Sequence, residues 1–410
     1  MNTRVVHPLV GVARTLVATP ALLRVRPSLN AFFAGYFARF PVVEAGGRLY
    51  LHSHLPPLDS AAYARFVRLH LIDRLQAPSH AQVAVTHACP QRCPVCYNRD
   101  RTGTPLDERE VHRVVQDLID AGVVWLGLTG GEPLLRRELP ELVALGRGRS
   151  EMKLFTTGMG VTARVAEELA AAGLGSVSVS IDHWDEAIHD EGRSYPGAWR
   201  AAIRAIETFL ANGRLHVGIS AVLPREALHD AEAVERLLAF AGTLGVHEVW
   251  LSETKPAVPS LWDSALVLTE DERRALAAYQ DRWNARVRRE KGGVTLNYLG
   301  HFEGAERFGC NAGRKMVYVD PFGEVSPCVF LPCSLGNVRE RPLQEIIADM
   351  WRRFPSEDRC FINRNWPLVE EFSGGVLPMA PARTAAMLGQ VSFRPLSAFN
   401  RRYYRGQRPL

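Results

Sequence analysis

Between residues 82 and 290 the sequence alternates short runs that favour strands with longer runs that favour helices. This alternation limits the possible folds more than any other feature of the sequence. The strand-like runs are 82–87, 123–130, 152–158, 176–182, 216–222 and 248–253. The helical patterns lie near 107–121, 134–146, 162–173, 197–212, 230–244 and 270–290. Six β/α units in succession predict one parallel sheet with right-handed crossovers, curled into a partial (β/α)6 barrel.

The cysteines of the chain fall into two groups. The first group follows the first predicted strand with the spacing Cys-x3-Cys-x2-Cys and consists of Cys89, Cys93 and Cys96. The second group consists of Cys310, Cys328, Cys333 and Cys360. Arg14 and Pro20 break the apolar run at the N-terminus, so we expect no signal peptide. Without a secretory signal, clustered thiols indicate metal binding rather than a disulfide framework.

The first cysteine group is compatible with three kinds of site. Three thiolates on one loop suit a [4Fe–4S] cluster that leaves one iron open to a small molecule. Zinc would normally need a fourth protein ligand. Cys93-Pro-Val-Cys96 alone would fit a redox pair. The iron–sulfur cluster is the favoured interpretation, and zinc and the redox pair remain as alternatives.

Polar motifs follow the next predicted strands at the points where those strands end. TGGEP ends the second strand, TTG the third and SID the fourth. In barrel-like sheets the chemistry gathers at the carboxyl ends of the strands. We therefore expect the first cysteine group and these motifs to share one site.

A Cys-x3-Cys-x2-Cys loop followed by Gly130-Gly131-Glu132-Pro133 resembles the radical S-adenosylmethionine (radical SAM) superfamily, over about residues 80–255. The resemblance implies a TIM-like partial barrel in which SAM binds the open iron of the cluster. It also implies that one electron cleaves SAM to methionine and a 5′-deoxyadenosyl radical, which abstracts a substrate hydrogen. The cofactors supply this chemistry, and the protein positions them and excludes water.

The resemblance also assigns SAM contacts on the first three strands. The Gly130–Pro133 segment corresponds to the stretch that binds the methionine amino group, through a backbone carbonyl and Glu132. Thr156-Thr157-Gly158 stands where the superfamily often has Thr-Asn-Gly, so Thr157 is a departure. The superfamily usually has an aromatic residue before the third cysteine. Val95 stands there instead, and Tyr97 is the candidate for the adenine contact.

Further SAM contacts are implied on the fourth and fifth strands. Ser180 and Asp182 point to the same side of the fourth strand and resemble the polar pair near the ribose or carboxylate of SAM. Arg193, in a His-Asp-x-x-Arg segment, resembles an arginine that meets the SAM carboxylate. Ile219 on the fifth strand is expected near adenine, together with Ser220.

The second cysteine group resembles the auxiliary iron–sulfur modules called SPASM and, in shortened form, Twitch. The pattern is Cys310-x12-Gly323-x4-Cys328, followed by LGNV and by Cys360. Four cysteines are enough for one fully ligated [4Fe–4S] cluster, so we expect a Twitch-like module with a second, auxiliary cluster. Zinc is the alternative, because four thiolates also make a tetrahedral site. The Cys328-x4-Cys333 spacing departs from the usual pattern.

These patterns divide the chain into four expected regions: 1–78, mostly helical with a hairpin at Gly46-Gly47; 79–293, the radical SAM core; 294–371, a small cysteine-rich α+β module; and 372–410, a basic and partly loose tail. In the first region, FFAGYFARF places five aromatic rings on one helical face. Core packing is the favoured interpretation of that stripe, and contact with a membrane surface is the alternative.

Charge and hydropathy bear on the surroundings of the protein. Residues 1–43 hold five arginines and no acidic residue, and the segment after Glu371 holds six arginines and no acidic residue. Two basic ends suggest contact with phospholipid headgroups or a phosphorylated substrate, although solvated arginines explain them equally well. With no 18-residue uncharged apolar run, we expect no membrane-spanning helix. We expect a cytoplasmic protein, with peripheral membrane contact as an option and no nucleic-acid partner.

Three functions are compatible with these features. The first is a radical SAM oxidoreductase or maturase acting on a peptide or small natural product, served by an external one-electron donor such as flavodoxin or ferredoxin. The second is a similar enzyme acting on a lipid or other membrane-associated substrate. The third is a non-enzymatic iron–sulfur or zinc protein. Glu253 and Lys255, at the end of the sixth strand, are candidate catalytic acid or base residues, with a structural ion pair as the alternative.

Overall fold

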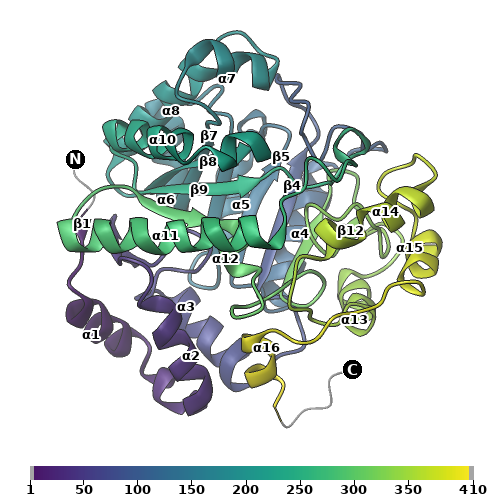
Figure 1. Cartoon of the computed structure of the whole chain (residues 1–410), viewed down its shortest axis with the longest axis horizontal. Coiled ribbons are helices and arrows are strands. Elements are labelled where there is room, and N and C mark those ends of the chain that lie inside the picture. The colour runs from purple at the N-terminus through teal and green to yellow at the C-terminus, as the bar shows by residue number, and fades with distance from the viewer. Residues whose placement is uncertain (1–3, 406–410) are drawn as a thin grey trace.

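Nine strands form the main sheet of the protein, in the order β10-β9-β8-β7-β6-β5-β4-β11-β12. The structure is a computed structural model and describes residues 4–405 (Figure 1). The strands are β4 (His80–Thr86), β5 (Trp125–Gly130), β6 (Glu151–Thr156), β7 (Leu174–Ser180), β8 (His216–Leu223), β9 (Glu248–Glu253), β10 (Thr295–Tyr298), β11 (Met316–Val319) and β12 (Val325–Ser326). All neighbours are parallel except β11 and β12, which pair antiparallel.

Helices follow the central strands as the sequence predicts. They are α4 (Glu108–Asp120), η3 (Pro133–Leu135), α5 (Leu139–Leu145), α6 (Ala163–Ala172), α7 (Glu186–Arg193), α8 (Ala198–Asn212), α9 (Arg225–His229), α10 (Ala231–Leu244), η4 (Pro259–Leu261) and α11 (Glu270–Glu290). Capping boxes begin two of them, Asp107 with Glu110 at α4 and Thr269 with Glu272 at α11. The apolar faces of these helices and of the strands share one large buried core.

The six predicted strands are present, and the sheet is longer than predicted at both edges. β10 pairs parallel with β9, so the sheet crosses the predicted boundary between residues 293 and 294. β11 pairs parallel with β4 and brings the cysteine-rich module onto the other edge. The buried ion pair of Arg101 with Asp320, at 3.1 Å, ties that module to the loop after β4. Both additions depend on contacts between distant segments, which local sequence patterns do not encode.

The N-terminal region forms its own apolar core beneath the barrel. It contains β1 (Arg4–Val5), α1 (Pro8–Ala18), η1 (Pro20–Arg24), α2 (Pro27–Phe37), β2 (Val43–Ala45), β3 (Arg48–Tyr50), α3 (Ala61–Phe66) and η2 (Val67–Ile72). β2 and β3 pair antiparallel, and Gly46 and Gly47 between them have positive φ, which confirms the predicted hairpin. The aromatic stripe of α2 packs inward against Phe308 and Phe399, as the core interpretation predicts.

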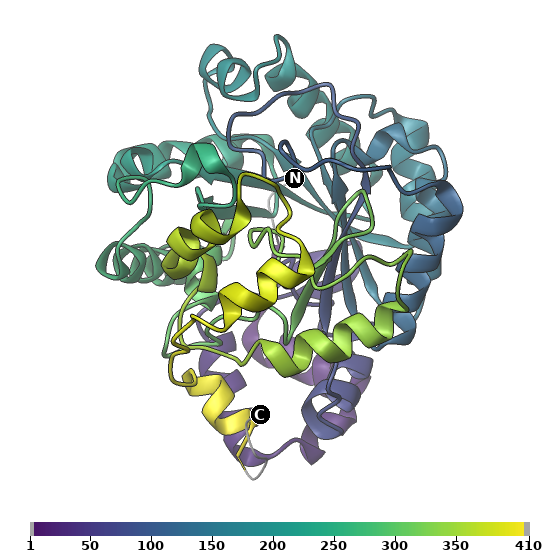
Figure 2. The ribbon, with the colours of Figure 1, turned by 90° about the vertical axis from the view of Figure 1, so that its right-hand side faces the viewer.

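The C-terminal third contains α12 (Leu299–Phe302), α13 (Leu343–Arg353), α14 (Phe361–Ser373), α15 (Pro381–Leu388) and α16 (Ala398–Tyr403). In Figure 2 this segment, green to yellow, lies in front of the strands of the sheet. The expectation of a partly loose tail is wrong for residues 372–405. Phe399 and Tyr403 are buried in the N-terminal core, and α16 lies beside α2 (Figure 1). Residues 1–3 and 406–410, which include Arg408 of the predicted basic tail, lie outside the described part of the chain.

Among residues 4–405, no helix is both long enough and apolar enough to cross a bilayer.

Candidate active site between two groups of cysteines

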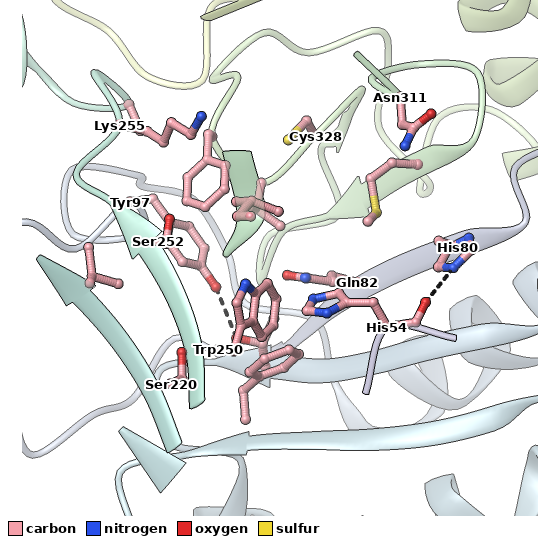
Figure 3. A pocket seen from close by; sticks show the side chains of 18 of the residues that line it. His54, His80, Gln82, Tyr97, Ser220, Trp250, Ser252, Lys255, Asn311 and Cys328 are labelled. Carbon is pink, nitrogen blue, oxygen red and sulfur yellow. Dashed lines mark hydrogen bonds between the residues drawn. The ribbon is translucent and has the colours of Figure 1, made fainter. Parts of the chain in front are cut away.

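A cavity of about 780 Å³ runs from the carboxyl ends of the central strands toward the N-terminal region. Its walls come from the loop after β4, the ends of β5 to β9, the helix α2 and the cysteine-rich module. Both groups of cysteines contribute to it, and Figure 3 shows Cys328, Lys255 and Tyr97 on one wall above Trp250 and His54. A cavity of this size suits a small molecule or a short segment of a larger one.

The first cysteine group lies on the loop between β4 and Arg101. Cys89 is exposed, Cys93 and Cys96 are half-buried, and all three line the cavity. The backbone N–H of Cys96 donates to the carbonyl of Cys93 at 3.2 Å, which folds the Cys-x2-Cys segment into a turn. The turn keeps Cys93 and Cys96 close along the loop, and all three cysteines line the same cavity, as a cluster with three protein ligands requires.

Gly130, the last residue of β5, and Gly131, the next residue, allow the loop that carries the cysteines to approach closely. A Cβ atom at Gly131 would lie 2.0 Å from the carbonyl oxygen of Ala88, and one at Gly130 would lie 2.3 Å from that of Thr86. The backbone N–H of Glu132 donates to the carbonyl of Ala88 at 2.8 Å. The Gly130–Pro133 segment therefore supports the cysteine loop directly, and Gly130 and Gly131 also line the cavity.

Glu132 has a different position from the one that the sequence suggests. Its side chain is fully buried and does not line the cavity. Its carboxylate accepts hydrogen bonds from the hydroxyl of Thr156 at 2.7 Å, and from the hydroxyl and the N–H of Thr157 at 2.6 Å each. Burial raises the pKa of Glu132, although these hydrogen bonds oppose the shift. Glu132 thus joins the ends of β5 and β6, while Thr157 itself lines the cavity; Pro133 begins η3 and does not line it.

The predicted polar contacts at the end of β7 converge. Ser180, Asp182 and Arg193 all line the cavity. Arg193 forms an ion pair with Asp182 at 2.7 Å, and the backbone N–H of Val222 donates to the other oxygen of Asp182 at 2.9 Å. Burial opposes the charge of Arg193, but Asp182 and the adjacent Cys93 raise its pKa. A half-buried, permanently charged guanidinium at this position can receive a carboxylate.

The prediction for Ile219 is wrong by one residue. Its side chain is fully buried in the hydrophobic core and does not line the cavity. Ser220 and Val222 line the cavity instead. Successive side chains of a strand point to opposite faces, so a site on Ser220 excludes the side chain of Ile219. Tyr97 does line the cavity, donating or accepting a hydrogen bond with the hydroxyl of Thr129 at 2.9 Å, and Val95 lies beside it in the wall.

The four cysteines of the second group do not all line the cavity. Cys310, Cys328 and Cys360 line the cavity, whereas Cys333 does not. Cys333 is 0 % exposed and lies in the hydrophobic core. The four cysteines were expected to form one site, and only three of them face the same space.

Glu253 and Lys255 belong to a buried ion network rather than to a free acid–base pair. Lys255 Nζ donates to Glu253 at 3.0 Å and to Glu303 at 2.6 Å, and Arg273 Nε donates to Glu253 at 2.8 Å. Burial opposes ionisation of Glu253, but Lys255 and Arg273 lower its pKa to about 2. Burial would lower the pKa of Lys255, but Cys360 and the two carboxylates raise it well above its usual value. Lys255 lines the cavity as a fixed cation, and Glu253 lies behind it.

The donor sets fit iron–sulfur clusters. Burial raises the pKa of Cys310 and that of Cys328 to about 12, so these free thiols are protonated at neutral pH and would release protons to a metal. A cation lies beside each group: the half-buried Arg193 next to Cys93, and the buried Lys255, whose Nζ lies 3.5 Å from the sulfur of Cys360. Such cations favour the thiolates that hold a cluster.

Several cavity residues escaped the sequence analysis. Trp250 and Ser252 are inward positions of β9, and Gln82 is an inward position of β4 (Figure 3). His54, from the N-terminal region, lies with its ring centroid 3.5 Å from that of Trp250. Alternation along β9 could have identified Trp250. No local pattern brings residue 54 to the barrel.

Comparisons with protein families support the two halves of the site separately. Residues 83–238 match the model of the radical SAM superfamily. Residues 310–365 match the model of SPASM, an iron–sulfur cluster-binding domain. The two matches contain the first cysteine group and the second one, respectively.

The chain is also similar to individual proteins. It is 27% identical to the AdoMet-dependent heme synthase of Methanosarcina barkeri over 67% of this chain and 84% of that protein. It is 28% identical to the PqqA peptide cyclase of Xanthomonas axonopodis pv. citri over 67% of this chain and 74% of that protein.

Solved structures share the fold. The structure of Streptococcus suis SuiB bound to the precursor peptide SuiA matches with a TM-score of 0.53 and 15% identity, over 70% of this chain and 67% of that one. The structure of anSMEcpe with bound AdoMet also matches with a TM-score of 0.53, at 16% identity, over 81% of this chain and 97% of that one.

Proposed function

The chain belongs to the radical SAM superfamily and carries a C-terminal SPASM domain, and from this premise we propose that it oxidises a peptide segment or small natural product enclosed between its two cysteine groups. One observation carries the proposal. A single cavity is lined by Cys89, Cys93 and Cys96 on one side and by Cys310, Cys328 and Cys360 on another. A substrate in that cavity could therefore lose a hydrogen atom near the first group and an electron near the second.

Resident cofactors supply the redox chemistry. The radical SAM domain holds a [4Fe–4S] cluster and SAM, and the SPASM domain holds auxiliary iron–sulfur. When bound, the first cluster and SAM supply an electron and a carbon centre that remove one hydrogen atom from the substrate, leaving methionine and 5′-deoxyadenosine. For a net two-electron oxidation the substrate would also give up one electron, which an auxiliary cluster held by the second group of cysteines would accept, and one proton, to solvent or a base.

The side chains of the protein would bind and orient SAM and the substrate, and they would exclude water from the cavity. We propose that Arg193, held by Asp182, pairs with the carboxylate of SAM; its ion pair with Asp182 at 2.7 Å supports this role. Ser180 and Thr157 offer hydroxyl groups on the same wall. The inner end of the cavity is rich in aromatic rings, and its histidines are neutral because burial lowers the pKa of His52 to about 3 and that of His80 to about 4. An apolar, water-poor environment protects a reactive substrate from side reactions.

Two relatives support a peptide substrate, since PqqA peptide cyclase and SuiB with its precursor SuiA are named for peptides. A third, the AdoMet-dependent heme synthase, is named for a non-peptide product. We infer a peptide or small natural product on these grounds, with flavodoxin or ferredoxin as the class of electron donor.

Anaerobic reconstitution tests the proposal. The loaded protein, reduced with dithionite and given SAM, should form 5′-deoxyadenosine and contain about eight irons per chain. A Cys93→Ala variant should form none while retaining about four irons. Deuterium transfer from labelled candidate substrates into 5′-deoxyadenosine would then identify the substrate. A fully loaded wild-type protein that cleaves no SAM would refute the enzyme and leave a non-enzymatic metal protein.

A membrane-associated substrate is a second candidate, favoured by the surface of α1 and η1. The buried residues of α1 are Gly11 and Thr15, while its large apolar side chains face outward. Of the eleven large hydrophobic side chains that are exposed among the described residues, six belong to this segment: Leu9, Val10, Val12, Leu16, Val17 and Leu23. Val17 is 85% exposed. An apolar helix face in an arginine-rich, acid-free segment is typical of proteins that lie on anionic bilayers.

Vesicle binding separates this candidate from the first. At low salt the protein should cosediment with phosphatidylglycerol vesicles, and Val12→Asp with Val17→Asp should abolish binding without changing SAM cleavage. Val376→Asp is the matched control, because Val376 is 66% exposed on another part of the surface. Absence of binding to anionic vesicles at low salt would reject a membrane-borne substrate.

A further inference from the structure

The second cysteine group is divided by a tight turn. The backbone N–H of Leu331 donates to the carbonyl of Cys328 at 3.2 Å, which reverses the chain after Cys328. Cys328 and Leu331 both line the cavity. Beyond the turn, the N–H of Ser334 donates to the carbonyl of Met379 at 2.9 Å, and Cys333 and Met379 form a β-bridge. These contacts hold Cys333 against the segment between α14 and α15, away from the cavity wall.

Three thiols remain within electrostatic range of one another. Cys310 interacts with Cys328, Cys328 with Cys360, and Cys360 with Cys310. Among residues 4–405, no such interaction links Cys333 with the three, and Arg101 is the one charged group that acts on it. Its side chain is fully buried in the hydrophobic core. A buried cysteine in apolar surroundings acts as a small packing residue.

We infer that the auxiliary cluster is held by Cys310, Cys328 and Cys360, that Cys333 is a packing residue, and that the fourth coordination position is open to the cavity. A four-iron cluster needs one ligand for each iron, so three thiolates leave one position for a donor from outside the cysteine set. This inference rests on the proposed function, because it places the open position where the substrate binds.

The neighbouring residues limit what can occupy that position. Glu303 lines the cavity, but its carboxylate is engaged by Lys255 at 2.6 Å. Lys255 also contacts the sulfur of Cys360, so a positive charge lies beside the cluster site. An anionic donor is therefore favoured, such as a carboxylate or thiolate of the substrate. The auxiliary cluster would thus anchor the substrate as well as accept its electron.

The experiment isolates the auxiliary cluster from the first one. A full-length variant with Cys89→Ala, Cys93→Ala and Cys96→Ala keeps only the second group. In that background, Cys333→Ala should retain about four irons per chain and the same EPR spectrum after reduction. Cys328→Ala, the matched substitution at a cavity thiol, should lose more than half of the iron. Equal loss of iron in the two variants, with both folded by circular dichroism, would overturn the inference.

A second measurement does not depend on changing the buried Cys333. Mössbauer spectra of the triple variant with native Cys333 should show one iron that differs from the other three. Labelled cyanide should bind that iron and shift the EPR signal. Four equivalent thiolate-bound irons, or no response to cyanide, would overturn the open position. A cyanide-insensitive spectrum that changes on Glu303→Gln would instead assign Glu303 as the fourth ligand.

The ligand assignment and the proposed function are tested by separate measurements, so a failure of one can be told apart from a failure of the other. SAM cleavage is measured on the wild-type enzyme and depends on the first cysteine group. Iron content and EPR are measured on a variant without that group. A three-cysteine cluster in a protein that cleaves no SAM would refute the proposed reaction and leave the ligand assignment intact.

Discussion

The amino group of Lys255 lies 3.5 Å from the sulfur of Cys360 and 2.6 Å from a carboxylate oxygen of Glu303. All three residues line the cavity, and the side chain of Lys255 is fully buried. The contact joins the end of the barrel to the cysteine-rich module, so one cation serves both the ion network of the barrel and the proposed auxiliary metal site.

We predict that Lys255→Met lowers the free energy of unfolding by about 3–5 kcal/mol, because Glu253 and Glu303 lose a buried partner. It should also lower the reduction potential of the auxiliary cluster, since a positive charge beside it is removed. Urea unfolding and EPR-monitored redox titration measure the two effects. Lys255→Arg, which keeps the charge, is the control. A stable Lys255→Met variant with an unchanged potential but no substrate turnover would indicate a catalytic proton carrier instead.

Gly131→Ala should eliminate the first cluster. The added Cβ would lie 2.0 Å from the carbonyl oxygen of Ala88, so the cysteine loop must move. Iron content should fall from about eight to about four per chain. Gly35→Ala is the matched control, because Gly35 lies in α2 with no atom within 4 Å of the added methyl group. That variant should keep all its iron and gain up to about 1 kcal/mol in stability.

Arg193→Met should weaken SAM binding at least tenfold, since a charge-assisted pair with the carboxylate of SAM is lost. Equilibrium dialysis of the reconstituted enzyme with labelled SAM measures the change, and the iron content should stay unchanged. Asp182→Asn preserves the size of the partner and should weaken SAM binding less, because Arg193 keeps its charge. Unchanged SAM affinity in Arg193→Met would remove this residue from the SAM site.

Periodic features of the sequence predicted the barrel well, because strands and helices form from local alternation of apolar residues. The Cys89–Cys96 spacing predicts the first metal site for a similar reason, since one loop carries every proposed ligand. Other positions depend on contacts between distant segments. Phe399 and Tyr403 look like part of a loose tail until α16 packs against α2.

Side-chain direction was the second limit of prediction. Ile219 and Ser220 are adjacent in sequence and face opposite sides of β8, so an error of one residue exchanges core for cavity. Cys333 has a thiol like its three neighbours, but a turn after Cys328 places it in the core. Residue type alone did not indicate that Glu132 would be enclosed by Thr156 and Thr157.

Lys315 is buried in the cavity wall and donates to the hydroxyl of Tyr403 at 2.8 Å. Burial and the nearby Arg314 lower its pKa to about 7. Between pH 7 and the unfolded pKa of about 10.4, the unfolded chain binds more protons than the folded one. The Lys315 contribution to stability therefore rises with pH across this window, by up to about 1.4 kcal/mol per pH unit.

Lys315→Met should remove that slope, so its advantage in unfolding free energy over the wild type should be largest below pH 7 and shrink toward pH 10. Urea unfolding of the two proteins at four pH values between 6 and 9.5 measures the difference. Tyr403→Phe is the control, because it removes the hydroxyl and keeps the buried amine, so the pH dependence should persist. A constant difference between Lys315→Met and wild type at every pH would mean that Lys315 has an ordinary pKa in the folded protein.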